Sequence, residues 1–124
     1  MLTIRREQMQ FLGGGFAPRL VDYLREHDAK AAGGFDDEGL LRLIDTGLGG
    51  ARVIGLTSEH DCARWIEILL VHGLDFGRNE RTTWAAEILR EPGLEAGARL
   101  AMIDAWLAAE EAWQRRRAQG DKHA

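Results

Sequence analysis

The spacing of apolar residues constrains this chain more than any other feature, because it follows the turn of an α-helix almost throughout. Between residues 59 and 72, for example, Cys62, Trp65, Ile66 and Leu69 recur at helical intervals. Such intervals place side chains on one face of a helix. Strands would need alternating apolar and polar residues, and the only β-branched cluster, RVIGLT, is short and interrupted by Gly55. We therefore predict an all-α fold.

Helix start and stop signals divide the chain into five or six helices. Ser58, with Asp61 three residues later, resembles a capping box, and Gly55 followed by Leu56 is typical of a helix C-terminus. Residues 28–35 and 74–83 read as loops, with Thr82 or Thr83 as the cap of the next helix. A compact single-domain bundle over residues 1–117, with a frayed tail at 118–124, is predicted. The expected helices cover residues 3–12, 18–27, 36–54, 58–72, 82–91 and 94–117.

Three consecutive glycines, Gly13 to Gly15, interrupt helix-favouring sequence on both sides. Each glycine costs about 1 kcal/mol relative to Ala in a helix interior. The run lacks the Lys-Ser/Thr of a phosphate loop and the preceding strand of a dinucleotide fingerprint. We interpret it as a hinge or tight turn, and whether it breaks the first helix stays open. Gly47 and Gly50, in contrast, would give the helix at 36–54 a slim patch for close helix packing.

Composition narrows the class of protein. The 124 residues are 45% hydrophobic and 29% charged with a net charge of -4, which fits a globular domain and disfavours nucleic acid as a partner. No apolar run approaches the roughly 18 residues of a membrane span, and no secretory signal is visible at the N-terminus. Cys62 is the only cysteine, which fits a reducing compartment. We expect a cytoplasmic protein without membrane contact.

Candidate catalytic groups do not converge in the sequence. Ser58 is the only serine and lacks a nucleophile-elbow motif, and the EHDC run at 59–62 spreads its four candidate metal ligands around a helix. We predict no catalytic residues, no metal site and no cofactor. A small enzyme using Asp61, His72 and Cys62 is kept as an alternative, which would require these side chains to share one pocket.

The aromatic content points to a binding surface. The chain has four tryptophans, and the last helix is expected to align Trp106 and Trp113 with Ala98, Met102 and Ala109 in one stripe. Exposed Trp beside Arg is typical of protein interfaces. The alternative is that this stripe simply covers the core. The predicted partner-binding residues are Phe76, Trp84, Trp106, Trp113 and Arg116.

Several segments resemble a family of small bacterial proteins. They are MLTIRREQM, YLREH, ARVIGLTSEHDCARWIEILLVHGLDFGRN and TTWAAEILRE, within residues 1–100. This chain departs from the family pattern at Gly13 to Gly15 and at Gly77, where the pattern has Asp. The family is found in gene neighbourhoods of type VI secretion effectors and spike components, and the resemblance implies that secretion context without implying a chemistry.

These observations favour a non-enzymatic protein-binding accessory, an adaptor or chaperone for a bacterial secreted toxin or its carrier. The expected partner is a secreted effector or a spike component. An immunity protein that neutralises a toxin, and often uses acidic surface, is the closest alternative. A homodimer joined through the exposed aromatic face is a further one.

Overall fold

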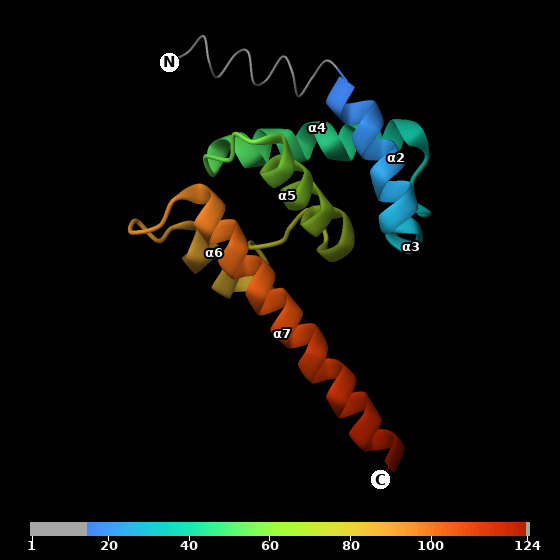
Figure 1. The fold of residues 1–124 in the computed structure, drawn as a ribbon, viewed down its shortest axis with the longest axis vertical. Helices are drawn as coiled ribbons and strands as arrows, with labels where there is room; N and C mark the ends of the chain where they lie inside the picture. Colours follow the sequence, from blue (N-terminus) through green and yellow to red (C-terminus); the bar gives the residue numbers. More distant parts are fainter. Residues whose placement is uncertain (1–14, 124) are drawn as a thin grey trace.

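The computed structural model describes residues 15–123 and confirms an all-α fold (Figure 1). The predicted helix at 3–12, and with it Gly13 and Gly14, lies outside the described residues. Within the described part, no helix is long and apolar enough to cross a membrane. The elements are α2 Ala17–His27, α3 Ala29–Ala32, α4 Asp37–Val53, α5 Glu59–His72, the 3-10 turn η2 Glu80–Thr82, α6 Thr83–Leu89 and α7 Ala96–His123.

Side chains fix where the two central helices begin. Asp36 precedes α4 and accepts a hydrogen bond from the Gly39 backbone N–H at 2.7 Å. Ser58 precedes α5 and accepts from the Asp61 N–H at 3.0 Å, as its position in the sequence predicts. Each cap satisfies a backbone donor that has no partner inside its helix.

The end of α4 is a Schellman motif, also as predicted. Gly55 adopts φ +88°, a left-handed conformation that favours glycine. Its N–H donates to the Arg52 carbonyl at 3.2 Å, and the Leu56 N–H donates to the Ala51 carbonyl at 2.9 Å. Leu56 is buried, so the turn that ends α4 is anchored in the core before α5 begins.

The helices α4 and α5 approach each other closely at Gly47. A Cβ atom on Gly47 would lie 2.6 Å from Cγ1 of Ile66, a distance that carbon atoms do not tolerate without a shift. Ile66 is fully buried. The absence of a side chain at position 47 therefore allows α5 to pack directly on the α4 backbone.

The core forms where α2, α4, α5 and α7 meet around this contact. Each helix contributes residues at helical spacing, and α5 contributes the most because it lies between the others (Figure 1). The largest fully buried side chains are Leu24, Leu40, Ile44, Ile66, Ile68, Ile103 and Cys62. Burial of such side chains is the main favourable term in the stability of a domain of this size.

Two local predictions require correction. Residues 29–32 of the predicted loop form the one-turn helix α3, because Ala, Lys, Ala, Ala are strong helix formers and Ala32 is fully buried. The second concerns Leu41, whose helical spacing with Leu48 predicts an apolar contact in α4; it is 42% exposed, since it lies beside the buried stripe.

The last helix differs more from expectation. Leu100 and Ile103 are buried and Leu107 is partly buried, whereas the predicted stripe with Trp106 and Trp113 faces solvent. α7 therefore has two apolar faces, and the aliphatic one meets the core. The helix also continues through the predicted tail to His123, and its C-terminal half extends away from the other helices (Figure 1).

The α4–α5 contact generates a matched pair of substitutions. We expect Gly47→Ala to destabilise the protein by about 1–3 kcal/mol, because the clash with Ile66 outweighs the gain in helix propensity. Gly49→Ala meets no atom within 4 Å and should stabilise the protein by up to about 1 kcal/mol. Urea denaturation of both variants measures the difference. Equal stability of the two would show that the helices do not touch at Gly47.

Candidate functional site

The structure places four of the five predicted partner-binding residues at the surface. Trp106 is 57% exposed and Trp113 52% exposed, Arg116 is exposed, and Trp84 is partly buried. Phe76 is only 3% exposed, so its assignment to the binding surface is corrected.

Phe76 is buried because aromatic rings enclose it. It lies edge-on to Trp65 and to Trp84, with ring centroids 6.0 Å away in both cases. Trp84 in turn packs against Trp106 at 5.9 Å. A continuous row of four aromatic rings thus connects the core to the surface of α7, and such edge-on pairs add to the stability from burial alone.

An apolar seam runs along the exposed side of α7. We define this aromatic seam as Met102, Trp106, Ala109 and Trp113, which are separated by four, three and four residues. All four side chains are exposed, although this spacing is typical of a helix face that packs against another helix. Exposed tryptophans on a helix that extends from the body constitute surface area available to a partner.

The ends of the seam differ in character. At its N-terminal end, a hollow of about 260 Å³ separates α6 from α7 and is lined by Trp84, Ile88, Met102 and Trp106 among others. At its C-terminal end, the guanidinium carbon of Arg117 lies 5.1 Å from the centre of the Trp113 ring, a cation–π contact. The seam therefore begins beside a hollow lined by aromatic residues and ends at a tryptophan that contacts an arginine.

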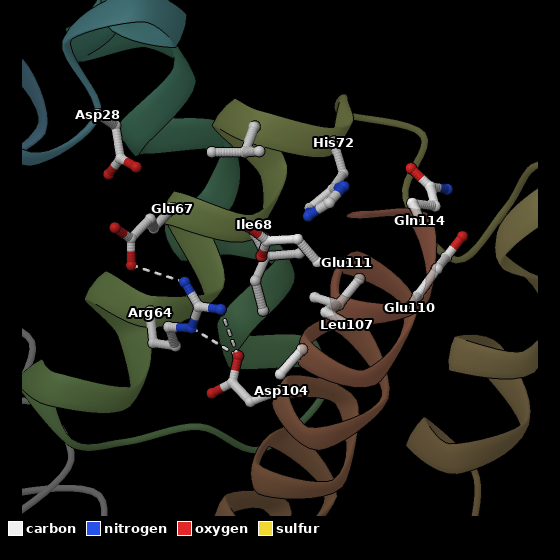
Figure 2. A pocket seen from close by; sticks show the side chains of 12 residues that line it. Asp28, Arg64, Glu67, Ile68, His72, Asp104, Leu107, Glu110, Glu111 and Gln114 are labelled. Carbon is white, nitrogen blue, oxygen red and sulfur yellow. Dashed lines mark hydrogen bonds and ion pairs between the residues drawn. The ribbon is translucent and has the colours of Figure 1, made fainter. Parts of the chain in front are cut away.

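A second candidate site is the charged groove between α5 and α7 (Figure 2). Its volume is about 520 Å³. Five carboxyl groups line it, and its basic residues are Arg64 and His72. The carboxyl groups belong to Asp28, Glu67, Asp104, Glu110 and Glu111.

Arg64 holds the groove together by bridging two helices. Its Nε donates to Oδ1 of Asp104 on α7 at 2.6 Å, and its Nη1 donates to Oε1 of Glu67 at 2.7 Å (Figure 2). Asp104 is 40 residues further along the chain, so this ion pair fixes α7 against α5. The planar guanidinium suits such a two-sided arrangement better than an ammonium group would.

The carboxyl groups of Asp28 and Glu67 influence each other at one end of the groove, where Asp28 can share its proton with Glu67 when it is protonated. Burial, together with hydrogen bonding to Glu67 and repulsion from its charge, raises the pKa of Asp28 to about 6. Burial acts in the same direction on Glu67, but hydrogen bonds from Asp28 and Arg64 outweigh it and lower the pKa of Glu67. Asp28 Oδ2 is buried, and no donor among the residues that the structure describes reaches it. A proton on Asp28 that is donated to Glu67 explains the opposite pKa shifts of the two groups and the lack of a donor at Asp28 Oδ2.

The structure does not bring Asp61, His72 and Cys62 into one pocket. Asp61 is in the first turn of α5 and His72 is its last residue, about 16 Å further along the axis. Cys62 is 1% exposed, and burial followed by the charge of Asp61 raises the pKa of its thiol. Partial burial and the charge of Arg64 lower the pKa of His72, which lines the charged groove. These three groups cannot act on one substrate atom in this arrangement.

No group of three or more His, Cys, Asp or Glu side chains within the described residues is placed to hold a metal ion. Comparison of the chain with protein-family models, with curated proteins and with solved structures finds no match.

The charged groove could not be found from sequence motifs. Asp28, Glu67 and Asp104 are far apart in the chain and meet only because α3 and α7 both pack against α5. The one local signal was the spacing of three between Arg64 and Glu67, which is typical of an ion pair on a helix.

The shared proton generates a prediction about pH. The folded protein holds the Asp28 proton more tightly than an Asp with its ordinary pKa of 3.8 would. Asp28 therefore adds stability below pH 3.8, and this contribution is lost as the pH rises through about 6. Asn at this position donates an N–H to Glu67 at any pH, so Asp28→Asn should be more stable than wild type at pH 7.5, with a difference that shrinks toward pH 4.

Thermal unfolding of wild type and Asp28→Asn between pH 4 and 8 checks this prediction. Asp45→Asn, on the exposed side of α4, is the control for loss of a carboxylate. If the difference in unfolding temperature between Asp28→Asn and wild type stayed constant with pH, the shared proton would be contradicted.

Proposed function

We propose that this protein is a non-enzymatic protein-binding accessory, an adaptor or chaperone for a bacterial secreted toxin or its carrier. The observation that supports the proposal most directly is the exposure of Trp106 and Trp113 on one side of a helix that extends from the body. Large aromatic side chains are the residues that contribute most to protein interfaces.

The geometry of the seam indicates how a partner would be recognised. Apolar anchors at positions i, i+4, i+7 and i+11 of a helix suit insertion into an apolar groove of another protein. Trp113 would be the aromatic anchor of the interface. Arg117, which contacts its ring, and the neighbouring Arg116 would form a basic rim around it. We therefore expect the partner to contribute an apolar groove bordered by acidic residues.

The secretion context comes from the resemblance to small bacterial proteins of type VI secretion gene neighbourhoods. It favours an effector or a spike component as the partner. An accessory that binds such a protein before export would need an exposed recognition surface and no catalytic centre, and the seam fits that requirement.

The proposal is tested with the partner that co-purifies from the native host, followed by titration of the purified partner in a calorimeter. We expect Trp113→Ser to weaken binding by roughly tenfold or more, because hot-spot tryptophans contribute on the order of 2 kcal/mol or more each. Val53→Ser is the matched control, since Val53 is an 87% exposed apolar residue on α4 and not part of the seam. Wild-type affinity for both Trp106→Ser and Trp113→Ser would overturn the proposal.

The charged groove supports one alternative function, an immunity protein. Glu110 and Glu111, which line the groove and are exposed, could pair with basic residues around the active site of a toxin, and electrostatic complementarity of this kind favours fast and specific association. Co-expression distinguishes the two functions. An immunity protein rescues growth from the toxin and loses that ability with Glu110→Gln and Glu111→Gln combined, whereas an adaptor supports toxin stability or export and depends on Trp113.

A further inference from the structure

A third cleft, on the side of the molecule where α4, the loop after α5 and the start of α7 meet, has a different chemistry from the two sites above. We call it the arginine cleft, and its volume is about 530 Å³. The residues that define it are Gly50, Trp65, Phe76, Arg78, Arg90 and Arg99. They come from α4, α5, the loop before η2, the end of α6 and the first turn of α7.

The charge of this cleft is unusual for the chain. Three guanidinium groups line it and no Asp or Glu does, although the protein carries a net charge of -4. None of the three arginines makes an ion pair with a described residue. Arg99 is held in place by a hydrogen bond from its Nε to the Glu91 carbonyl at 3.0 Å. Positive charge without a compensating carboxylate in a concave site attracts anions.

The wall of the cleft also contains a buried hydrogen-bond donor without a partner. Trp65 is 5% exposed, and its indole Nε1 makes no hydrogen bond within the described structure. A buried donor left unsatisfied costs about 1–3 kcal/mol. Nε1 faces Gly50, where a Cβ atom would lie only 3.3 Å from it. With glycine at position 50, no α4 side chain stands against the indole N–H at this point, although the N–H is itself buried.

Apolar groups complete the site. Phe76 packs edge-on against Trp65, and Val53, Ile54 and Leu89 also line the cleft. A volume of about 530 Å³ lies within the range of small-molecule sites, and such sites combine an apolar lining with a few directed polar groups.

We propose that the arginine cleft binds a small organic anion. The apolar body of the ligand would lie against Val53, Ile54 and Leu89, and its carboxylate or phosphate group would pair with Arg78, Arg90 and Arg99. An acceptor atom of the ligand would reach the buried Trp65 N–H through a small shift of the backbone around Gly50. This site is separate from the aromatic seam and does not depend on the proposed function.

The observations favour a small molecule over a nucleic acid. A phosphate backbone is bound by basic residues spread along a groove or face, and a chain with net charge -4 does not favour it. Here the three arginines line a single concave site, so one or two anionic groups with an attached apolar body fit best.

The test is a titration of the ¹⁵N-labelled protein with sodium octanoate, observed through the four tryptophan indole N–H signals. The Trp65 signal is assigned by its absence in Trp65→Phe. We expect octanoate to shift the Trp65 signal saturably and the Trp113 signal not at all. Inorganic phosphate at equal concentration should bind at least fivefold more weakly, because it lacks the apolar body. Equal binding of phosphate, or octanoate shifts confined to the seam tryptophans, would overturn the proposal.

Variants locate the site independently of the signal assignment. Arg90→Gln should weaken octanoate binding at least fivefold, whereas Arg42→Gln removes the same charge from an exposed position of α4 outside the cleft and should leave binding within twofold of wild type. Gly50→Ala narrows the approach to the Trp65 N–H and should weaken binding while the protein stays folded. Thermal unfolding verifies folding, and equal affinity of Arg90→Gln and Arg42→Gln would contradict the assignment.

Discussion

The contact of Gly47 with Ile66 is the constraint on which the rest of the structure depends. With no side chain at position 47, α5 packs against the backbone of α4 and becomes the central helix of the domain. Different sides of α5 then line different sites. Trp65 lines the arginine cleft, and Arg64 and Glu67 line the charged groove. The burial of Ile66, which is next to Trp65 and Glu67 in the helix, fixes how these side chains are oriented. One close approach between two helices therefore positions both sites.

The second determinant is the double apolar character of α7. Its aliphatic residues Leu100 and Ile103 satisfy the core, and Arg64 secures the helix through Asp104. On its other side, Trp84 packs against Trp106 and Arg117 lies over Trp113, yet both seam tryptophans stay more than half exposed. A tryptophan exposes a large apolar area to water, which is unfavourable. The proposed binding of a partner would remove this area from water.

Features encoded by neighbouring residues could be predicted from the sequence. The cap at Ser58, the Schellman turn at Gly55 and the buried face of α5 each depend on residues within one or two turns of a helix. The choice between two apolar faces of α7 could not be made, because it depends on how the helix meets α5. The burial of Phe76 likewise depends on Trp65 and Trp84, which come from separate helices. The proton shared by Asp28 and Glu67 requires two helices to bring carboxyl groups together, and no local pattern signals it.

The four tryptophans differ in exposure, and this difference separates the core from the seam. ¹⁹F NMR of the protein labelled with 5-fluorotryptophan, in the presence of a soluble paramagnetic probe, measures the solvent exposure of each ring. We expect strong broadening of the Trp106 and Trp113 signals, weaker broadening for Trp84 and protection of Trp65, with the first two becoming protected when the partner is added. A Trp113 signal as protected as that of Trp65 in the protein alone would contradict the claim that α7 presents a free aromatic seam.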